Sequence, residues 1–159
     1  MTTYNRTVAG GGTVGHPSNA AVPYVMTSLV VDTVDGGGVG GDVIQLLDIP
    51  ADTMIVSGCL EVLEVRGNGQ VTMDIGFTGG DVDCLLDGSP LAAGFSPFLE
   101  AAIGASGSNC RILTGADTID ALVLDGGSTG ETALRFRIHV VLADVSKNPT
   151  ETATVSTGT

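Results

Sequence analysis

Residues 70–77 read Gln-Val-Thr-Met-Asp-Ile-Gly-Phe, and apolar side chains occupy every second position of this stretch. These positions are Val71, Met73, Ile75 and Phe77. Successive side chains of a strand point to opposite faces, so a repeat of two residues places the four on one face. The stretch therefore predicts a half-buried β-strand whose other face carries Gln70, Thr72 and Asp74.

The same alternation predicts a long final strand over residues 131–145. Its second face begins with Arg135, Arg137 and His139. The positions expected to face the core are Leu134, Phe136, Ile138, Val140 and Leu142.

Other stretches predict additional strands, over residues 24–33, 42–48, 53–65, 111–113 and 118–125. Residues 53–65 are apolar at both odd and even positions, which indicates a strand covered on both faces or carrying a bulge. Between residues 79 and 109, the apolar stretches 91–93 and 98–103 are interpreted as a short helix or a long packed loop.

Seven or so short strands separated by Gly- and Asp-rich turns predict an all-β chain. The composition agrees, with 24 Gly and only 15% charged residues in 159. We expect a single-domain antiparallel β-sandwich, jelly-roll-like, over residues 21–146. Residues 1–20 are expected to form an extended N-terminal arm, and residues 147–159 a flexible C-terminal tail.

The charge is distributed unevenly along the chain. The net charge is −12, but residues 1–31 contain no acid and one base, Arg6, so the other 128 residues carry 18 acids and 5 bases, a net −13. A body this acidic repels phosphate, so we expect no nucleic-acid partner. Because no apolar stretch approaches about 18 residues and no signal sequence is recognised, we also expect no membrane association.

Two glycine-rich stretches match ligand-binding patterns without the structural context that those patterns need. Residues 10–15 satisfy G-x-G-x-x-G, but no apolar strand precedes them and Pro17 follows where a helix would run. Residues 37–45 match one unit of the calcium-binding β-roll, whose sites are built from several stacked units. We therefore predict no cofactor.

No set of residues nominates a metal or catalytic site. Asp81, Asp83 and Asp87 form an acidic cluster in a glycine-rich loop, but the spacing of a calcium loop is missing, so a solvated loop is expected. A nucleophilic site needs a Ser or Cys beside a His, yet His16 lies in the arm and His139 in a regular strand, where a surface or interface role is expected. We predict no metal ion, no catalytic residue and no enzymatic activity.

The three cysteines, Cys59, Cys84 and Cys110, include no C-x-x-C pair of the kind used for zinc or redox chemistry. We expect them to be reduced thiols that pack as small apolar side chains.

Several short blocks resemble the capsid decoration (cement) proteins of tailed bacteriophages. The blocks are residues 43–53 (VIQLLDIPADT), 60–62 (LEV), 71–76 (VTMDIG), 116–120 (ADTID) and 137–145 (RIHVVLADV). The resemblance spans residues 40–146. The chain departs from the family pattern at Asp52, where the family often has Gly, and in the apolar stretch of residues 91–103.

This resemblance implies a homotrimer on the outside of the virion that binds the major capsid protein and bridges neighbouring capsomers, after assembly in the host cytoplasm. We expect Arg6, His16 and Tyr24 to contact the capsid or a neighbouring subunit, because the N-terminal segment lacks acids and is rich in glycine. The alternatives are a head-fibre or tail adhesion module that binds a receptor or glycan and, third, a small hydrolase.

Overall fold

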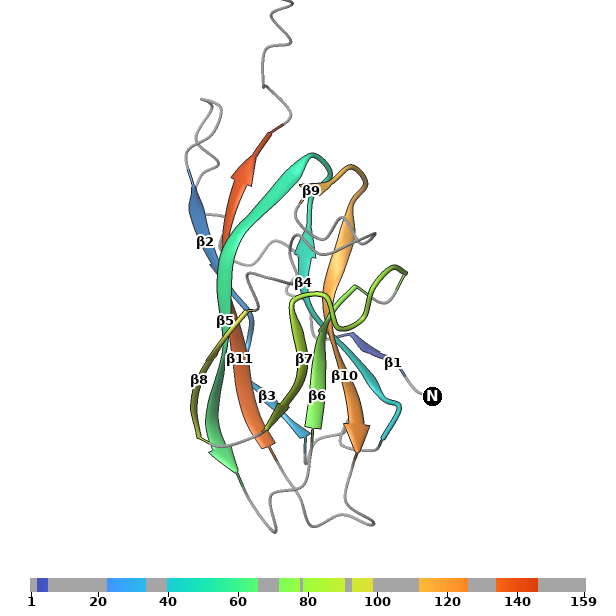
Figure 1. Cartoon of the computed structure of the whole chain (residues 1–159), viewed down its shortest axis with the longest axis vertical. Coiled ribbons are helices and arrows are strands. Elements are labelled where there is room, and N and C mark those ends of the chain that lie inside the picture. Colours follow the sequence, from blue (N-terminus) through green and yellow to red (C-terminus); the bar gives the residue numbers. More distant parts are fainter. Residues whose placement is uncertain are drawn as a thin grey trace, which may run out of the picture.

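Two β-sheets pack face to face in the computed structural model of the chain (Figure 1). The structure describes residues 3–5, 23–33, 40–65, 72–77, 79–90, 93–98, 112–125 and 134–145. Within these ranges every regular element is a strand. None of the described residues belongs to a helix that could cross a membrane.

The six-stranded sheet has the order β2-β11-β5-β8, with β3 also pairing with β11 and β9 with β5. Its strands are β2 (Tyr24–Thr27), β3 (Val31–Asp32), β5 (Thr53–Val65), β8 (Gly94–Pro97), β9 (Ile112–Leu113) and β11 (Leu134–Asp144).

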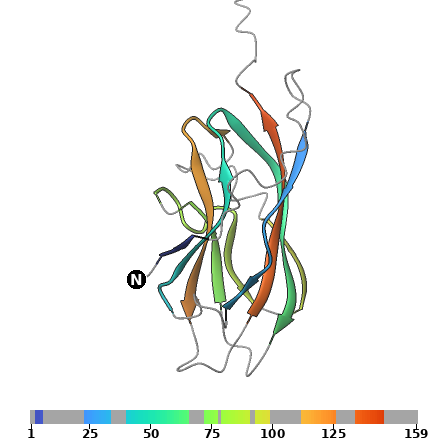
Figure 2. The same ribbon diagram turned by 180° about the vertical axis from the view of Figure 1, so that it is seen from behind.

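The five-stranded sheet has the order β1-β4-β10-β6-β7. Its strands are β1 (Thr3–Asn5), β4 (Val43–Ile49), β6 (Thr72–Gly76), β7 (Leu86–Pro90) and β10 (Asp117–Asp125). Figure 2 shows the two layers from behind. Neighbouring strands of both sheets run antiparallel except β1, which is parallel to β4. The predicted antiparallel β-sandwich is therefore confirmed.

The last strand, β11, supplies the centre of the core. All five of its predicted core residues, from Leu134 to Leu142, are 1% exposed or less. They contact the apolar residues of both sheets in one continuous cluster. Met73, Ile75 and Phe77, from the alternating residues 70–77, belong to the same cluster, as their alternation predicts.

Two bulges explain why β5 is apolar at both parities. Against β11, Leu142 pairs with Ile55 and Val141 with Ser57, so Val56 is an extra residue. A second shift makes Leu63 extra in the same way. Both extra side chains are 38% exposed, whereas the inner face of β5 stays buried. Of the two alternatives left open by the sequence, the bulged strand is the one observed.

The predicted strand over residues 24–33 is interrupted in its middle. The Ser28 N–H donates to the Ile138 carbonyl at 3.0 Å, and the Ser28 hydroxyl accepts from the Ile138 N–H at 3.0 Å. The Thr33 hydroxyl likewise accepts from the Leu134 N–H at 2.8 Å. These side chains complete the hydrogen bonding of β11, while Leu29 and Val30 are exposed. The apolar residues Leu29 and Val30 therefore lie in the interruption and not at the centre of a strand.

Strands β7 and β8 lie between residues 79 and 109, where the sequence predicted no strand. They flank residues 91–93, the first stretch interpreted as a helix or a long loop, of which residues 91 and 92 lie outside the described residues. Both strands are short, and each contains a glycine with positive φ, 59° at Gly88 and 134° at Gly94. Pro90 and Pro97 end them. These residues remove the alternation by which a strand is recognised. Residues 99–103 lie outside the described residues.

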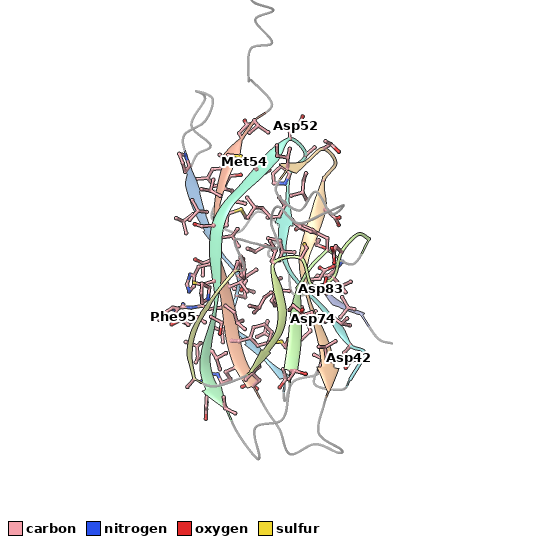
Figure 3. The ribbon with its side chains drawn as sticks, in the orientation of Figure 1. Asp42, Asp52, Met54, Asp74, Asp83 and Phe95 are labelled. Carbon is pink, nitrogen blue, oxygen red and sulfur yellow. The ribbon has the colours of Figure 1, made fainter. Side chains whose placement is uncertain are left out.

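Asp52 lies in the turn between β4 and β5 and has a φ of 55° (Figure 3). This left-handed conformation favours Gly, and Asp and Asn are among the side chains that tolerate it. The Asp52 carbonyl accepts a hydrogen bond from the Val145 N–H at 2.8 Å, which ties the turn to the end of β11. Asp at a position where the resembled family often has Gly is thus compatible with the same turn.

Gly58 is required by the packing of Phe98 inside the sandwich. A Cβ at Gly58 would overlap the Phe98 ring and lie 2.7 Å from the His139 carbonyl oxygen. The Phe98 N–H also donates to the Gly58 carbonyl at 2.9 Å, so the ring is held above the strand. Phe98 fills the space that a side chain of β5 would otherwise occupy.

We expect Gly58→Ala to lower the free energy of unfolding by about 1–3 kcal/mol, because the added methyl group overpacks the core. Urea denaturation followed by circular dichroism measures the change. Gly115→Ala is the matched control, since a Cβ there meets no atom within 4 Å. Equal stability of the two variants would contradict the packing of Phe98 against Gly58.

Candidate interaction surfaces

The outer face of the six-stranded sheet is a continuous surface made by four strands. In one row across it, Phe95 of β8 pairs with Glu61 of β5, and Glu61 pairs with Arg137 of β11. In the next row, Pro97 pairs with Cys59, Cys59 with His139, and His139 with Thr27 of β2. Because paired residues of neighbouring strands share a face, these side chains lie on one side of the sheet.

Ion pairs occupy the middle of this face. The Arg137 Nε donates to Glu61 Oε2 at 2.5 Å, and His139 Nε2 lies 2.8 Å from the same oxygen. The other ring nitrogen of His139, Nδ1, lies 3.0 Å from the Thr27 hydroxyl. Glu61 therefore joins two groups of β11 and fixes the His139 ring on the sheet.

Arg135 forms a second, looser set of ion pairs at the far end of the same face. Its Nη1 lies 3.4 Å from Glu64 Oε2, and its Nε lies 3.7 Å from Asp32 Oδ2. The predicted second face of the last strand is thus confirmed: Arg135, Arg137 and His139 all lie outside the core, and each has an acidic partner on a neighbouring strand.

Hydrogen bonds from Arg137 and His139 lower the pKa of the Glu61 carboxyl below its ordinary value of 4.5. A carboxyl whose pKa is lower in the folded than in the unfolded chain stabilises the fold above the unfolded value. This contribution is lost as the pH falls through the folded value. The pairing of β5 with β11 should therefore weaken in acid.

We expect Glu61→Gln to reduce the loss of thermal stability between pH 5 and pH 3, because the variant has no carboxylate to protonate at this position. Melting temperatures across this range measure the effect. Asp48→Asn, at an exposed carboxylate of the other sheet, is the matched control. The ion-pair contribution is contradicted if Glu61→Gln and Asp48→Asn change the pH profile equally.

Apolar side chains lie at both ends of the charged centre. Phe95, on the edge strand β8, is 68% exposed, and its ring centroid lies 6.5 Å from that of His139. Figure 3 shows Phe95 on the side of β8 that points away from the second sheet. At the opposite edge, Val25 of β2 pairs with Val141 and is 62% exposed. Val141 lies four residues from Arg137 on β11, so Val25 and Phe95 share the outer face.

The five-stranded sheet presents a different outer face, part of which is covered by a loop of residues 79–85. A Cβ at Gly76 would clash with the backbone of Asp81 and Val82, so the loop lies directly on the strand. The Phe77 N–H donates to the Asp81 carbonyl at 2.9 Å, and the Leu85 N–H donates to the Ile75 carbonyl at 2.9 Å. These contacts fold the loop over the end of β6.

Acidic side chains gather around this loop. Burial raises the pKa of Asp74, which is 6% exposed and accepts a hydrogen bond from the Gly88 N–H at 2.7 Å. A hydrogen bond with Asp81 raises the pKa of Asp83. The sequence predicts Asp74 on the outer face of a half-buried strand, but Asp74 is buried and bound to the backbone of Gly88 in β7. No group of side chains suited to a metal ion occurs among the described residues.

Cys84 lies in the same loop, is buried, and forms a disulfide. Cys59 is free and half-buried, and it lies on the outer face of the six-stranded sheet. The expectation of three reduced thiols is therefore wrong for Cys84. Cys110 lies outside the described residues.

We expect the unreduced protein, unfolded in urea, to react with Ellman's reagent at one thiol per chain, because Cys59 is free and Cys84 is bonded. Cys59→Ser should remove this reactivity, and prior reduction should reveal all remaining cysteines. Three reactive thiols before reduction would contradict the disulfide.

Of the three residues predicted to contact a partner, Tyr24 lies among the described residues. Tyr24 lies in β2, packs against the core, and is partly buried. Burial raises the pKa of the Tyr24 phenol, against the effect of a hydrogen bond with Thr53. Arg6 and His16 lie outside the described residues, as do residues 10–15. Of the β-roll match, residues 43–45 belong to β4, which is a regular strand of the sheet.

Sequence reasoning missed the ladder formed by Glu61, Arg137 and His139. Glu61 and Arg137 lie on two strands and are 76 positions apart in the sequence. The basic face of the last strand was the signal available, because basic residues are rare in the chain. Its acidic partners could be found only after the order of the strands was known.

The fold recurs in solved structures, although no family model and no curated protein sequence matches the chain. A chain in the capsid of Ralstonia phage GP4 has a TM-score of 0.68 and 17% identity, and the match covers 89% of this chain and 97% of that one. A chain in the capsid asymmetric unit of cyanophage Pam1 has a TM-score of 0.60 and 13% identity, covering 86% and 96%.

A third match is a chain in the acidic stable capsid structure of Helicobacter pylori bacteriophage KHP30. It has a TM-score of 0.54 and 14% identity, covering 79% of this chain and 90% of that one. The sandwich described above is therefore a fold that also occurs in protein chains of three phage capsids.

Proposed function

We propose that this chain is a capsid decoration protein of a tailed bacteriophage, which binds the outer surface of the head and stabilises the shell by bridging neighbouring capsomers. The observation that carries the proposal is the likeness of fold to chains of three phage capsids over nearly the whole length of each. A non-enzymatic, structural role in the virion follows from this proposal.

The size of the matched chains supports decoration over a shell-forming role. The alignments cover 79–89% of this chain and 90–97% of the matched chains, so those chains are also small, with about one sandwich each. A sandwich of this size can be added to a shell that a larger protein builds. The proposed partner is accordingly the major capsid protein.

The charge of the body is consistent with a place on the outside of the particle. A net charge of −13 over residues 32–159 would be repelled by packaged nucleic acid and by anionic membranes. On the exterior, the same charge would keep particles apart in solution. We infer no nucleic-acid partner, no membrane partner and no cofactor.

The N-terminal arm, residues 1–20, is the proposed contact with the capsid, through Arg6 and His16, with Tyr24 at its junction with the sandwich. In the proposed homotrimer three arms would bind together. Linked contacts raise the effective concentration of each one, so arms that are weak alone can hold a trimer on the lattice.

The test is deletion of residues 1–20, followed by co-sedimentation with heads that lack the protein. We expect the number of bound copies to fall about tenfold or more, because avidity is lost with the arms. The shortened chain loses the edge strand β1 but should still fold, since the buried core residues of the described part of the chain lie after position 30. Circular dichroism of the truncated chain checks this.

Three results would contradict the proposal, each a different part of it. Undiminished binding by the folded, truncated chain would refute the role of the arm. Electron microscopy of purified particles locates the intact protein: copies over the head support decoration, copies only at fibres or the tail support the adhesion alternative, and absence from particles refutes a virion role.

A further inference from the structure

The two outer faces of the sandwich are unequal. The loop of residues 79–85 lies on the five-stranded sheet at Gly76, and Asp74 of the same strand is buried. On the six-stranded sheet, Phe95 and Val25 remain more than 60% exposed at opposite edges of one face. The outer face of the five-stranded sheet is thus partly covered by a loop of the same chain. The outer face of the six-stranded sheet presents apolar side chains to the solvent.

Acidic and basic side chains nearly cancel on the outer face of the six-stranded sheet. It carries three acids, Asp32, Glu61 and Glu64, which pair with Arg135 and Arg137. The formal charge of this set is −1, and the rest of the chain carries the remaining −11. Two copies of so acidic a chain repel each other over most approaches, and the repulsion is smallest at this face.

The edge strands β2 and β8 lack the charges that usually protect edge strands. β2 reads Tyr-Val-Met-Thr and β8 reads Gly-Phe-Ser-Pro, so neither contains an acidic or basic residue. Exposed apolar side chains continue from β2 into Leu29 and Val30, beside β3. Edge strands of monomeric proteins normally carry charges or are covered, so these two edges fit contacts with a partner.

We propose that copies of this chain associate head to tail through these edges, with the β8 edge and Phe95 of one copy packed on Val25, Leu29 and Val30 of the next. The contact joins two different patches of one molecule, and such a contact closes into the proposed homotrimer when successive copies are related by a rotation of 120°. Pro97 removes a backbone donor from β8, so the contact is made by side chains and does not continue the sheet. The inference deepens the proposed homotrimer and does not depend on capsid binding.

Charge-adding variants at the two edges test the contact. We expect Phe95→Glu and Val25→Glu each to raise the Kd of self-association about tenfold or more, because each places an unpaired charge in an apolar interface. Leu124→Glu is the matched control, since Leu124 is a 46%-exposed apolar residue on the other sheet and the change in net charge is the same. Sedimentation velocity gives the masses, and thermal melting confirms folding.

Mixing the two variants distinguishes a head-to-tail contact from a twofold-symmetric one. Each variant keeps one intact edge, so an equimolar mixture of Phe95→Glu and Val25→Glu should form a dimer through the single unaltered contact, although each alone is a monomer. A twofold contact of Phe95 with Phe95 would instead leave the Val25→Glu variant dimeric on its own, and mixing the two variants would form no additional dimer. That result, a monomeric unmodified chain, or an assembly unchanged by both variants would each overturn the inference.

The same variants separate this inference from the proposed function. Heads that bind the monomeric Phe95→Glu variant, weakly because avidity is lost, would leave decoration in place while confirming the edge contact. An unmodified trimer that does not bind heads would refute decoration and leave the edge contact standing.

Discussion

The pairing of β5 with β11 is the constraint on which the rest of the structure depends. It is the longest ladder of the molecule, running from Leu134 opposite Val65 to Asp144 opposite Thr53. Its inner face supplies the centre of the core, and its outer face carries the ion pairs of Glu61 with Arg137 and His139. One strand pair therefore supplies both the centre of the core and the ion pairs on the outer face.

Strands with a regular alternation could be predicted from the sequence, and so could the core that they form. Residues 53–65 coincide with β5, and all five core positions of the last strand are buried. Short strands with Gly and Pro could not be predicted, because β7 and β8 contain too few alternating residues. The burial of Asp74 could not be predicted either, since its hydrogen-bond partner belongs to β7, one of the strands that the sequence did not reveal.

The surfaces were harder to predict than the core for the same physical reason. A buried residue is recognised by its own apolarity, whereas a surface is defined by which strands are neighbours. Phe95 and Val25 are 70 positions apart in sequence and share a face only because β2, β11, β5 and β8 are adjacent in that order. The disulfide of Cys84 likewise depends on tertiary structure. A reduced Cys84 was expected because the sequence showed no pairing motif.

The bulges of β5 have a consequence for how the length of this strand can vary. Val56 and Leu63 are the residues that β11 does not pair, so removing either one leaves the ladder on both sides in register. A deletion anywhere else in the strand would instead turn the following inner residues, such as Leu60 and Val62, toward the solvent. Natural variants of this strand that differ by one residue should therefore have gained or lost it at these two points.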